Sequence, residues 1–233
     1  MLRLHCGGKY IPRRNHLTGR RFFSTIRSIM DMLEIEVKFL LEDVSAIRDR
    51  IIRLGGIGGD SVFETNIRFE NPFLGLGKNG SILRLRKDRK TTLTFKSNTG
   101  DPDDQYKINT EYEVTVGDFS MMKQILEALG FHQEQLYEKN RETILWHNTT
   151  LCMDVMPFGH FLEIEGGKED IRDMAQRLGL AWEDRITLSY VAIFERIKKE
   201  CRLPFSDITF ENFKRFPVNL LEYRFLLDAK PSE

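Results

Sequence analysis

Charged residues two positions apart recur along this chain. The acidic pairs are Glu34/Glu36, Glu111/Glu113 and Glu163/Glu165, and the basic pairs are Arg84/Arg86 and Lys139/Arg141. Residues i and i+2 of a β-strand lie on one face, so each pair would place two like charges side by side. Carboxylates without a Cys or His companion favour Mg²⁺ or Mn²⁺ over zinc, and guanidinium groups match phosphate oxygens bidentately. The two kinds of pair together predict a site for a polyphosphate bridged by a divalent metal.

Strand-like stretches with a period of two carry these pairs. They span about 33–41, 61–70, 81–88, 91–97, 109–116, 133–147, 150–156 and 160–166. Short connections at 88–90, 147–149 and 157–159 predict antiparallel hairpins. Apolar residues at helical spacing predict four helices, over about 44–54, 119–129, 171–178 and 188–197.

Each strand taken alone has the ordinary pattern of an antiparallel sheet whose charged face is solvated. The set as a whole favours a different arrangement, because full charges repeat at i and i+2, acids cluster with acids, and several amphipathic helices need an apolar face to cover. A sheet closed into a barrel, with charges inside and helices outside, satisfies all three conditions, and eight strands can enclose a small ligand. We therefore predict an α+β protein with an eight-stranded antiparallel β-barrel, a charged lumen and covering amphipathic helices.

The segment Glu34-Ile35-Glu36-Val37-Lys38 matches the pattern E-x-E-x-K, and further charged motifs follow it in order. They are Leu83-Arg84-Leu85-Arg86, Leu93-Thr94-Phe95-Lys96, Glu111-Tyr112-Glu113, Glu138-Lys139-Asn140-Arg141, and Asp154 ahead of Phe161-Leu162-Glu163-Ile164-Glu165. This ordered set, over about 32–195, resembles the CYTH superfamily, the triphosphate tunnel metalloenzymes. The resemblance implies a tunnel that is open at both ends and binds a triphosphate.

The resemblance also implies a role for each matching residue. The essential Mg²⁺ or Mn²⁺ ion would be held by Glu34, Glu36, Glu163 and Glu165. Asp154, with Glu113, would assist a second metal ion or orient water. The triphosphate would be bound by Lys38, Arg84, Arg86, Lys96 and Arg141, with Lys139 near the phosphate that is cleaved. Many relatives carry an aromatic residue where this chain has Arg68, and an inward-facing Arg68 would add positive charge and change substrate preference.

Three functions remain open at this point. We favour metal-dependent hydrolysis of inorganic triphosphate or of an organic triphosphate such as thiamine triphosphate. The alternatives are a class IV adenylate cyclase, which converts ATP to cyclic AMP and pyrophosphate, and a polyphosphate-binding module without turnover. The expected partner is a small-molecule triphosphate, with no nucleic acid and no membrane, although an RNA 5′-triphosphate and a homodimer are left open. We expect Glu36→Ala to abolish turnover and to leave folding intact or improved, because it removes a repelling charge.

The charge of the chain is balanced overall but unevenly distributed. There are 35 Lys and Arg against 35 Asp and Glu, yet residues 1–31 hold seven basic residues and one acidic residue. This leader is typical of a mitochondrial transit peptide, which would place the protein in the matrix. The alternative is an over-long start upstream of Met32, which would leave the protein in the cytoplasm, and we favour it slightly. We divide the chain into a leader at 1–31, a tunnel domain at 32–200 and a C-terminal appendage at 201–233.

Other classes of protein have little support in the sequence. The cysteines Cys6, Cys152 and Cys201 form no C-x-x-C motif, which disfavours a disulfide framework or a zinc site. Cys152 shares a face with Asp154 but lacks a partner base, so we do not expect a thiol nucleophile. The stretch 75–80 fits G-x-G-x-x-G, but it precedes a strand and not a helix, so it does not predict a dinucleotide site.

Overall fold

The computed structural model describes residues 32–227. The predicted leader at 1–31 and residues 228–233 lie outside this part of the chain, so both interpretations of the leader stay predictions.

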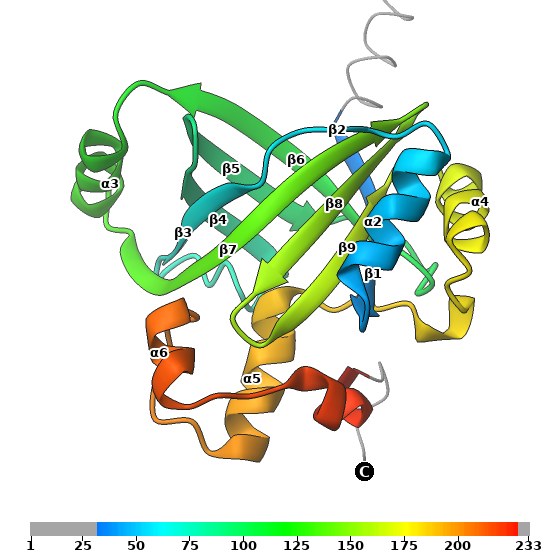
Figure 1. Ribbon diagram of the computed structural model, residues 1–233. Helices are drawn as coiled ribbons and strands as arrows, with labels where there is room; N and C mark the ends of the chain where they lie inside the picture. Colours follow the sequence, from blue (N-terminus) through cyan, green and yellow to red (C-terminus); the bar gives the residue numbers. More distant parts are fainter. Residues whose placement is uncertain (1–31, 228–233) are drawn as a thin grey trace, which may run out of the picture. The chain divides into compact units, whose positions relative to one another are not determined.

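An antiparallel β-barrel forms the centre of the described chain (Figure 1). Its strands are β1 (Leu33–Leu41), β3 (Val62–Glu70), β4 (Ser81–Lys87), β5 (Thr91–Asn98), β6 (Lys107–Val116), β7 (His132–Trp146), β8 (Thr149–Met156) and β9 (Gly159–Glu165). They are hydrogen-bonded in the order β7-β3-β4-β5-β6-β1-β9-β8, and the pairing of β7 with β8 closes the barrel. The predicted eight-stranded antiparallel barrel of an α+β protein is confirmed. A two-residue strand that was not predicted, β2 (Ile57–Gly58), adds to β7.

The strands turn apolar side chains outward and charged side chains inward. On β4, Leu83 and Leu85 pack with Ile67 of β3 in an outer core. Side chains alternate along a strand, so Arg84 and Arg86 of the same strand face the lumen. The predicted charged lumen follows from this alternation, repeated around the barrel.

Three helices cover the outside of the barrel. Helices α2 (Val44–Arg53) and α4 (Lys168–Leu178) pack together over β1 and β9, whereas α3 (Phe119–Ala128) packs against β4 and β7. Asp43 and Asp118 cap α2 and α3 by accepting a hydrogen bond from the backbone N–H three residues later. Gly179 ends α4 in the left-handed conformation, with φ of 70°. These helices match the predicted positions to within three residues.

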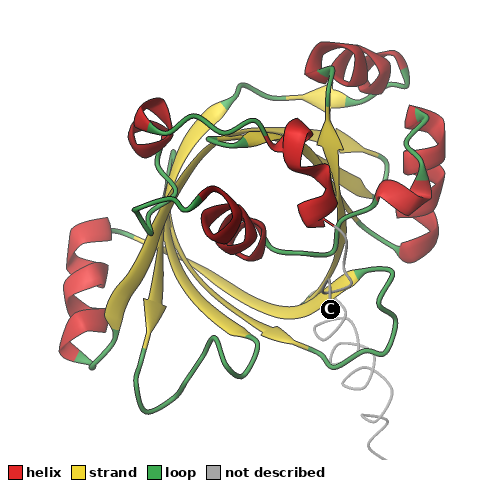
Figure 2. Ribbon diagram, turned by 90° about the horizontal axis from the view of Figure 1, so that it is seen from below, coloured by secondary structure: helices red, strands yellow, loops and turns green. Residues whose placement is uncertain are grey.

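The C-terminal elements cover one end of the barrel, as Figure 2 shows from below. After the short helix η1 (Trp182–Asp184) come α5 (Tyr190–Cys201), α6 (Phe210–Arg215) and η2 (Leu220–Leu227). Between α5 and α6, Ile208 donates its N–H to the carbonyl of Leu136 over 2.8 Å and accepts from the N–H of Glu138 over 2.9 Å, so this segment extends the edge of β7. The expectation of a tunnel open at both ends is therefore wrong for this end. The physical reason is an apolar core in which the lumen-facing Phe161 and Met156 pack against α5 and α6.

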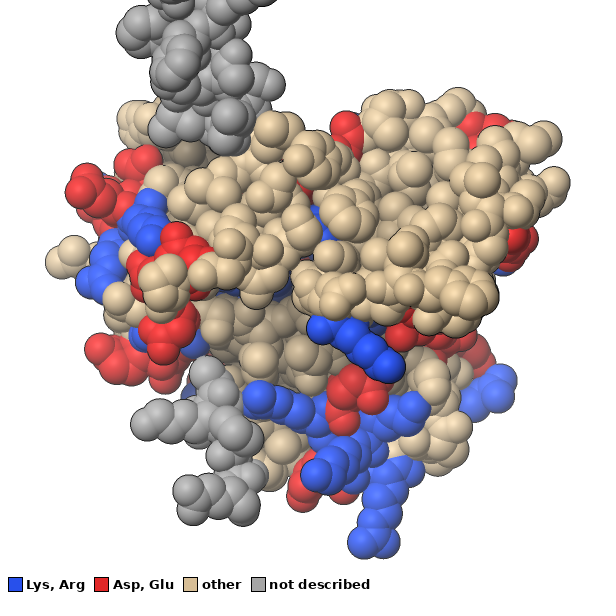
Figure 3. All heavy atoms as spheres, turned by 180° about the vertical axis from the view of Figure 1, so that it is seen from behind, with Lys and Arg blue, Asp and Glu red and all other residues tan. Residues whose placement is uncertain are grey.

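The surface seen from behind separates uncharged from basic regions. In Figure 3 the upper part carries few charged side chains, and Lys and Arg gather lower down, at the height of the C-terminal elements in Figure 1. Leu33, Tyr112 and Val114 remain exposed on the outer faces of β1 and β6. A homodimer stays a prediction.

No helix within 32–227 is both long enough and apolar enough to cross a membrane.

Candidate active site in the barrel lumen

One wall of the lumen is mainly acidic. It is formed by β6, β1 and β9, which are neighbours in the barrel, and only Lys38 and Lys107 interrupt it with positive charge. Its carboxylates belong to Glu34, Glu36, Glu111, Glu113, Glu163 and Glu165. Pairing of β1 with β9 places Glu36 opposite Glu165, and Lys38 opposite Glu163. Acidic pairs that are far apart in the sequence thus meet on one surface.

The opposite wall is mainly basic. It is formed by β7, β3 and β4, again neighbours in the barrel, and Glu64 is the acidic residue among its lumen-facing side chains. Its cations belong to Arg68, Arg84, Arg86, Lys139 and Arg141. Because β5 and β8 separate the two walls on either side, charges of opposite sign face each other across the lumen.

Lysines already contact several of the acidic side chains. Lys38, whose side chain is 2% exposed, donates to Oε1 of Glu36 over 2.7 Å and lies 3.2 Å from Oε1 of Glu163. Lys107 Nζ lies 2.6 Å from the same oxygen of Glu36. Burial alone would raise the pKa of Glu36, but the ion pairs with Lys107 and Lys38 lower it well below the usual range. The pKa of Lys38 is raised by Glu163 and Glu36 despite its burial.

Lys96 reaches the acidic wall from β5. Its Nζ lies 2.5 Å from Oε1 of Glu34 and 2.8 Å from Oε2 of Glu111. These ion pairs outweigh burial and raise the pKa of Lys96. The lysine therefore stays charged at the boundary between the two walls.

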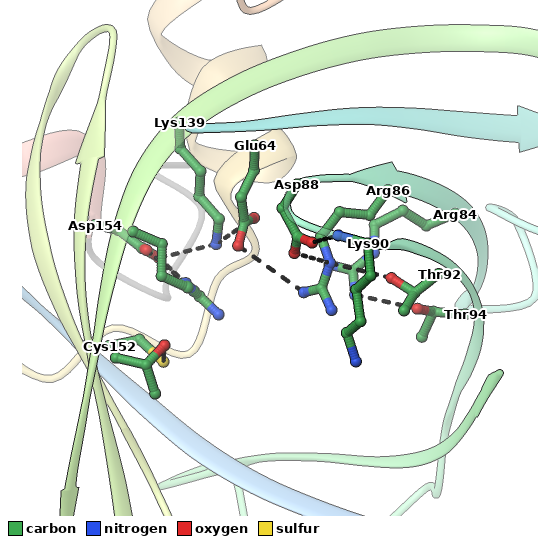
Figure 4. Close-up of polar contacts among 12 residues, drawn as sticks. Glu64, Arg84, Arg86, Asp88, Lys90, Thr92, Thr94, Lys139, Cys152 and Asp154 are labelled. Atoms are coloured by element: carbon green, nitrogen blue, oxygen red, sulfur yellow. Dashed lines mark hydrogen bonds and ion pairs between the residues drawn. The ribbon is translucent and has the colours of Figure 1, made fainter. Parts of the chain in front are cut away.

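Asp154 accepts hydrogen bonds from two basic residues of the basic wall. Its Oδ2 accepts a hydrogen bond from Lys139 Nζ over 3.0 Å, and its Oδ1 accepts one from Arg141 Nε over 2.6 Å. Arg141 Nη2 donates to both Asp154 and Glu163. The resemblance gave these three residues different roles: Lys139 near the cleaved phosphate, Arg141 in triphosphate binding, and Asp154 at a second metal ion or a water. The structure brings them together in one cluster, and Figure 4 shows Lys139 and Asp154 pointing toward each other at its left.

Tyr190, at the start of α5, completes this cluster from outside the barrel. Its hydroxyl donates to Oδ2 of Asp154 over 2.8 Å. Its ring centroid lies 5.4 Å from the ammonium nitrogens of both Lys38 and Lys139, within range of cation–π attraction. The pKa of Tyr190 is raised well above its usual value, first by burial and then by the negative charge of Asp154, so the hydroxyl remains a donor.

Arg86 and Arg84 point into the lumen from β4, facing Lys139 and Asp154 (Figure 4). Arg86 lies 3.3 Å from oxygens of Asp88 and of Glu113. Arg84 donates to the Tyr137 hydroxyl and the Thr94 hydroxyl, each over 3.3 Å, and no carboxylate within residues 32–227 lies within 4.0 Å of its guanidinium.

The acidic wall has suitable donors for Mg²⁺ or Mn²⁺, because its ligands would all be carboxylate oxygens. Partial burial and the nearby charges of Glu34 and Glu36 raise the pKa of Glu165 to about 7. The part of this shift that comes from Glu34 and Glu36 is one that a bound cation would offset. No three His, Cys, Asp or Glu side chains in the described chain already converge as a metal site. Glu34 and Glu36 would therefore have to exchange lysine contacts for the ion, and Glu163 its contacts with Lys38 and Arg141. No Lys or Arg within residues 32–227 lies within 4.0 Å of the Glu165 carboxylate.

The structure places every predicted site residue in the lumen, but some partners were not foreseen. Lys107 lies two residues before the predicted start of its strand, so extending the period-two pattern would have found it. Glu64 alternates correctly within the second predicted strand, and it lies 3.7 Å from Lys139. Nothing in the sequence indicated that Tyr190 belongs to the site, because a tyrosine at the start of a helix does not reveal which barrel residue it contacts. Cys152 is buried, and burial raises the pKa of its thiol to about 11, which agrees with its exclusion as a nucleophile.

Comparisons with known proteins match this barrel. A family model described as the CYTH domain matches residues 32–187. A protein of Methanocaldococcus jannaschii named "Putative adenylate cyclase MJ0240" is 28% identical over 144 residues, which cover 61% of this chain and 81% of the relative. The structure of the PH1012 protein from Pyrococcus horikoshii is 29% identical with a TM-score of 0.58, covering 67% of this chain and 96% of that one.

A second solved structure shares the fold at lower identity. It is an X-ray structure from Vibrio parahaemolyticus, described as a "putative adenylate cyclase", with 19% identity and a TM-score of 0.63, and it covers 70% of this chain and 98% of that one. The family match contains every strand of the barrel and ends before α5. The chain therefore belongs to the CYTH domain family.

Proposed function

We propose that this chain is an enzyme that hydrolyses a triphosphate in its lumen with the help of a divalent metal ion. The observation that carries the proposal is the pair of facing walls of opposite charge, β6-β1-β9 acidic and β7-β3-β4 basic. A triphosphate needs positive groups along its oxygens, and a metal ion that bridges it to the protein needs carboxylates opposite them. The lumen supplies both within one barrel cross-section.

The residues of the basic wall bind and orient the phosphates in this proposal. Arg84 and Arg86 bind oxygens along the chain, and Lys96 moves from its carboxylate partners to a phosphate. Lys139 and Arg141, positioned by Asp154, contact the terminal phosphate, where charge develops as water attacks phosphorus and the bond to the leaving pyrophosphate breaks. Mg²⁺ or Mn²⁺, when bound, supplies charge neutralisation and an acidified water. Glu34, Glu36, Glu163 and Glu165 would hold the ion, with Asp154 available to a second one.

Adenylate cyclase activity is the second candidate. The name of the Methanocaldococcus jannaschii relative favours it. The same grip could hold ATP, with the ribose 3′-hydroxyl attacking the α-phosphorus and pyrophosphate leaving. A polyphosphate-binding module without turnover is the third candidate, but it would need no wall of carboxylates.

A product assay separates these candidates. The full chain is incubated with Mg²⁺ or Mn²⁺ and with tripolyphosphate, thiamine triphosphate or ATP in turn. Our proposal expects orthophosphate release, lost in Lys139→Gln and kept in Lys123→Gln, whose side chain pairs with Glu127 on the outer helix α3. Cyclic AMP and pyrophosphate without orthophosphate would identify a cyclase. Tight tripolyphosphate binding without any product would identify a binding module.

A further inference from the structure

The basic wall continues past the residues that the family resemblance assigns to the triphosphate. On β3, Asn66 lies opposite Arg86 and Arg68 lies opposite Arg84 in the pairing with β4. Both alternate with the outward-facing Ile67, so both face the lumen. Along β3, Val62 lies opposite Arg141, and Arg68 lies six positions further along the strand, a distance of roughly 20 Å. The row of positive charge is therefore longer than three linked phosphates require.

Polar groups at this end of the row lack partners within the protein. Asn66 is 0% exposed, and neither its amide oxygen nor its amide nitrogen has a hydrogen-bond partner among residues 32–227. Nε of Arg68 and Nε of Arg84 are buried and also lack partners within that range. A buried polar group without a partner destabilises the folded state. Four such atoms, two from Asn66 and one each from Arg68 and Arg84, lie on neighbouring positions of β3 and β4. Together they indicate a binding site for a polar ligand.

The charges at this place favour an anion. Arg68 and Arg84 are directly opposite each other on paired strands, an arrangement that is destabilising for like charges. Arg84 has no carboxylate within 4.0 Å in the described chain. Arg68 has Glu134 at 3.2 Å, but that carboxylate is 41% exposed, so solvent weakens the pair. The two guanidinium groups are thus only partly neutralised.

The protein also holds Arg68 in position. Its Nη1 donates to the amide oxygen of Gln135 over 3.2 Å, and the Gln135 amide nitrogen donates to the carbonyl of Ser206 over 2.7 Å. Ser206 belongs to the C-terminal segment that covers this end of the barrel. The cover therefore contacts Arg68 through Gln135.

We propose that Asn66 and Arg68 form an additional phosphate subsite at the covered end of the lumen. This subsite shares Arg84 with the triphosphate site and binds a fourth phosphate of a linear chain. The two arginine Nε–H groups and the Asn66 amide nitrogen are donors without protein partners within residues 32–227, and charge-assisted donors of this kind suit phosphate oxygens. The inference rests on the proposed function, in which the lumen binds a triphosphate, and it extends that binding site by one phosphate. It predicts that the protein prefers chains of four or more phosphates to three.

Binding to the full chain in metal-free buffer tests this subsite without turnover. Isothermal titration calorimetry compares linear tetrapolyphosphate with tripolyphosphate, and adenosine 5′-tetraphosphate with ATP. We expect tetrapolyphosphate to bind about tenfold more tightly than tripolyphosphate, the effect of one added charge-assisted contact. Arg68→Gln should reduce this ratio to near one, Arg68→Lys should restore part of it, and the control Arg89→Gln, on the exposed β4–β5 turn, should leave it unchanged.

Asn66→Leu supplies a second, independent readout. It removes an unpartnered buried amide, so the thermal midpoint should rise while the preference for tetrapolyphosphate falls. A midpoint that falls, with the preference intact, would show that Asn66 serves only the fold and would overturn its place in the subsite.

The remaining outcomes separate the subsite from the proposed function. If the wild type binds tripolyphosphate and tetrapolyphosphate with equal affinity, the additional subsite is overturned, whereas the proposed triphosphate site is not. Failure of both polyphosphates to bind overturns both. If ATP binds more tightly than tripolyphosphate and Arg68→Gln abolishes this difference, the proposed subsite binds a nucleoside. That result would overturn its assignment to a phosphate. An Arg68-dependent gain for both tetraphosphates supports a subsite for any chain of four phosphates, and a gain for tetrapolyphosphate alone supports a subsite for inorganic chains.

Discussion

The hydroxyl of Tyr190 donates a hydrogen bond to Oδ2 of Asp154 over 2.8 Å, and this contact joins the C-terminal helix α5 to the candidate active site. Asp154 in turn receives hydrogen bonds from Lys139 and Arg141. A residue outside the family match thus positions the groups that we expect to act on the terminal phosphate.

Removing this hydroxyl should impair turnover more than folding. In Tyr190→Phe the ring keeps its contacts with Lys38 and Lys139, whereas Asp154 loses one hydrogen bond. We expect kcat to fall about tenfold, in line with the loss of a bond to a charged group, with KM little changed. Tyr112→Phe, on the exposed outer face of β6, is the matched control. An unchanged kcat in Tyr190→Phe would show that the contact is only structural.

Substitution of Glu36 should destabilise the protein as well as inactivate it. From the sequence alone, the loss of a repelling charge should spare or improve folding. The structure shows instead that Glu36 pairs with Lys38 and Lys107. Breaking a buried pair by removing one partner costs about 3–5 kcal/mol. We expect Glu36→Gln to lower the free energy of unfolding by an amount near this range, measured by urea denaturation.

The surface residue Glu127 provides the control for that measurement. Its side chain is 47% exposed and pairs with Lys123 on the outer helix α3, and exposed pairs contribute about 0–1 kcal/mol. Glu127→Gln should therefore change stability little and leave activity intact. A Glu36→Gln protein as stable as the wild type would restore the expectation drawn from the sequence.

Divalent metal should stabilise the folded chain through the acidic wall. A ligand at a hundredfold excess over its dissociation constant adds about 2.7 kcal/mol to the free energy of unfolding. Mg²⁺ or Mn²⁺ should therefore raise the thermal midpoint of the wild type by several degrees, and EDTA should reverse the shift. The increase should be smaller in Glu165→Gln, because that carboxylate has the fewest competing contacts. Equal increases in both proteins would place the ion elsewhere.

The C-terminal segment should behave as part of the barrel's core. Phe213 of α6 is 5% exposed and packs in the apolar core at the covered end, so Phe213→Ala should cost about 3–5 kcal/mol. Phe225, at 60% exposed, is the control, and Phe225→Ala should change stability by less than about 0.5 kcal/mol. If both substitutions had the same small effect, the segment would be a dispensable appendage.

The sequence by itself determined the eight main strands and the faces of their side chains. A period of two is a local property of an extended chain, so the inward position of Glu34 and Glu36, or of Arg84 and Arg86, follows without knowing which strands pair. Helix starts at Asp43 and Asp118 are equally local, since a cap bonds to a backbone group three residues away.

Only the tertiary structure decided which charges meet. The order of strands places glutamates from three strands on one wall and cations from three others on the opposite wall, and strand order depends on contacts between residues far apart in the chain. The same holds for Lys38 with Glu163, for Tyr190 with Asp154, and for the partnerless Asn66. Periodicity can assign a residue to the lumen, but its neighbours across the lumen depend on how the barrel closes and on what covers its end.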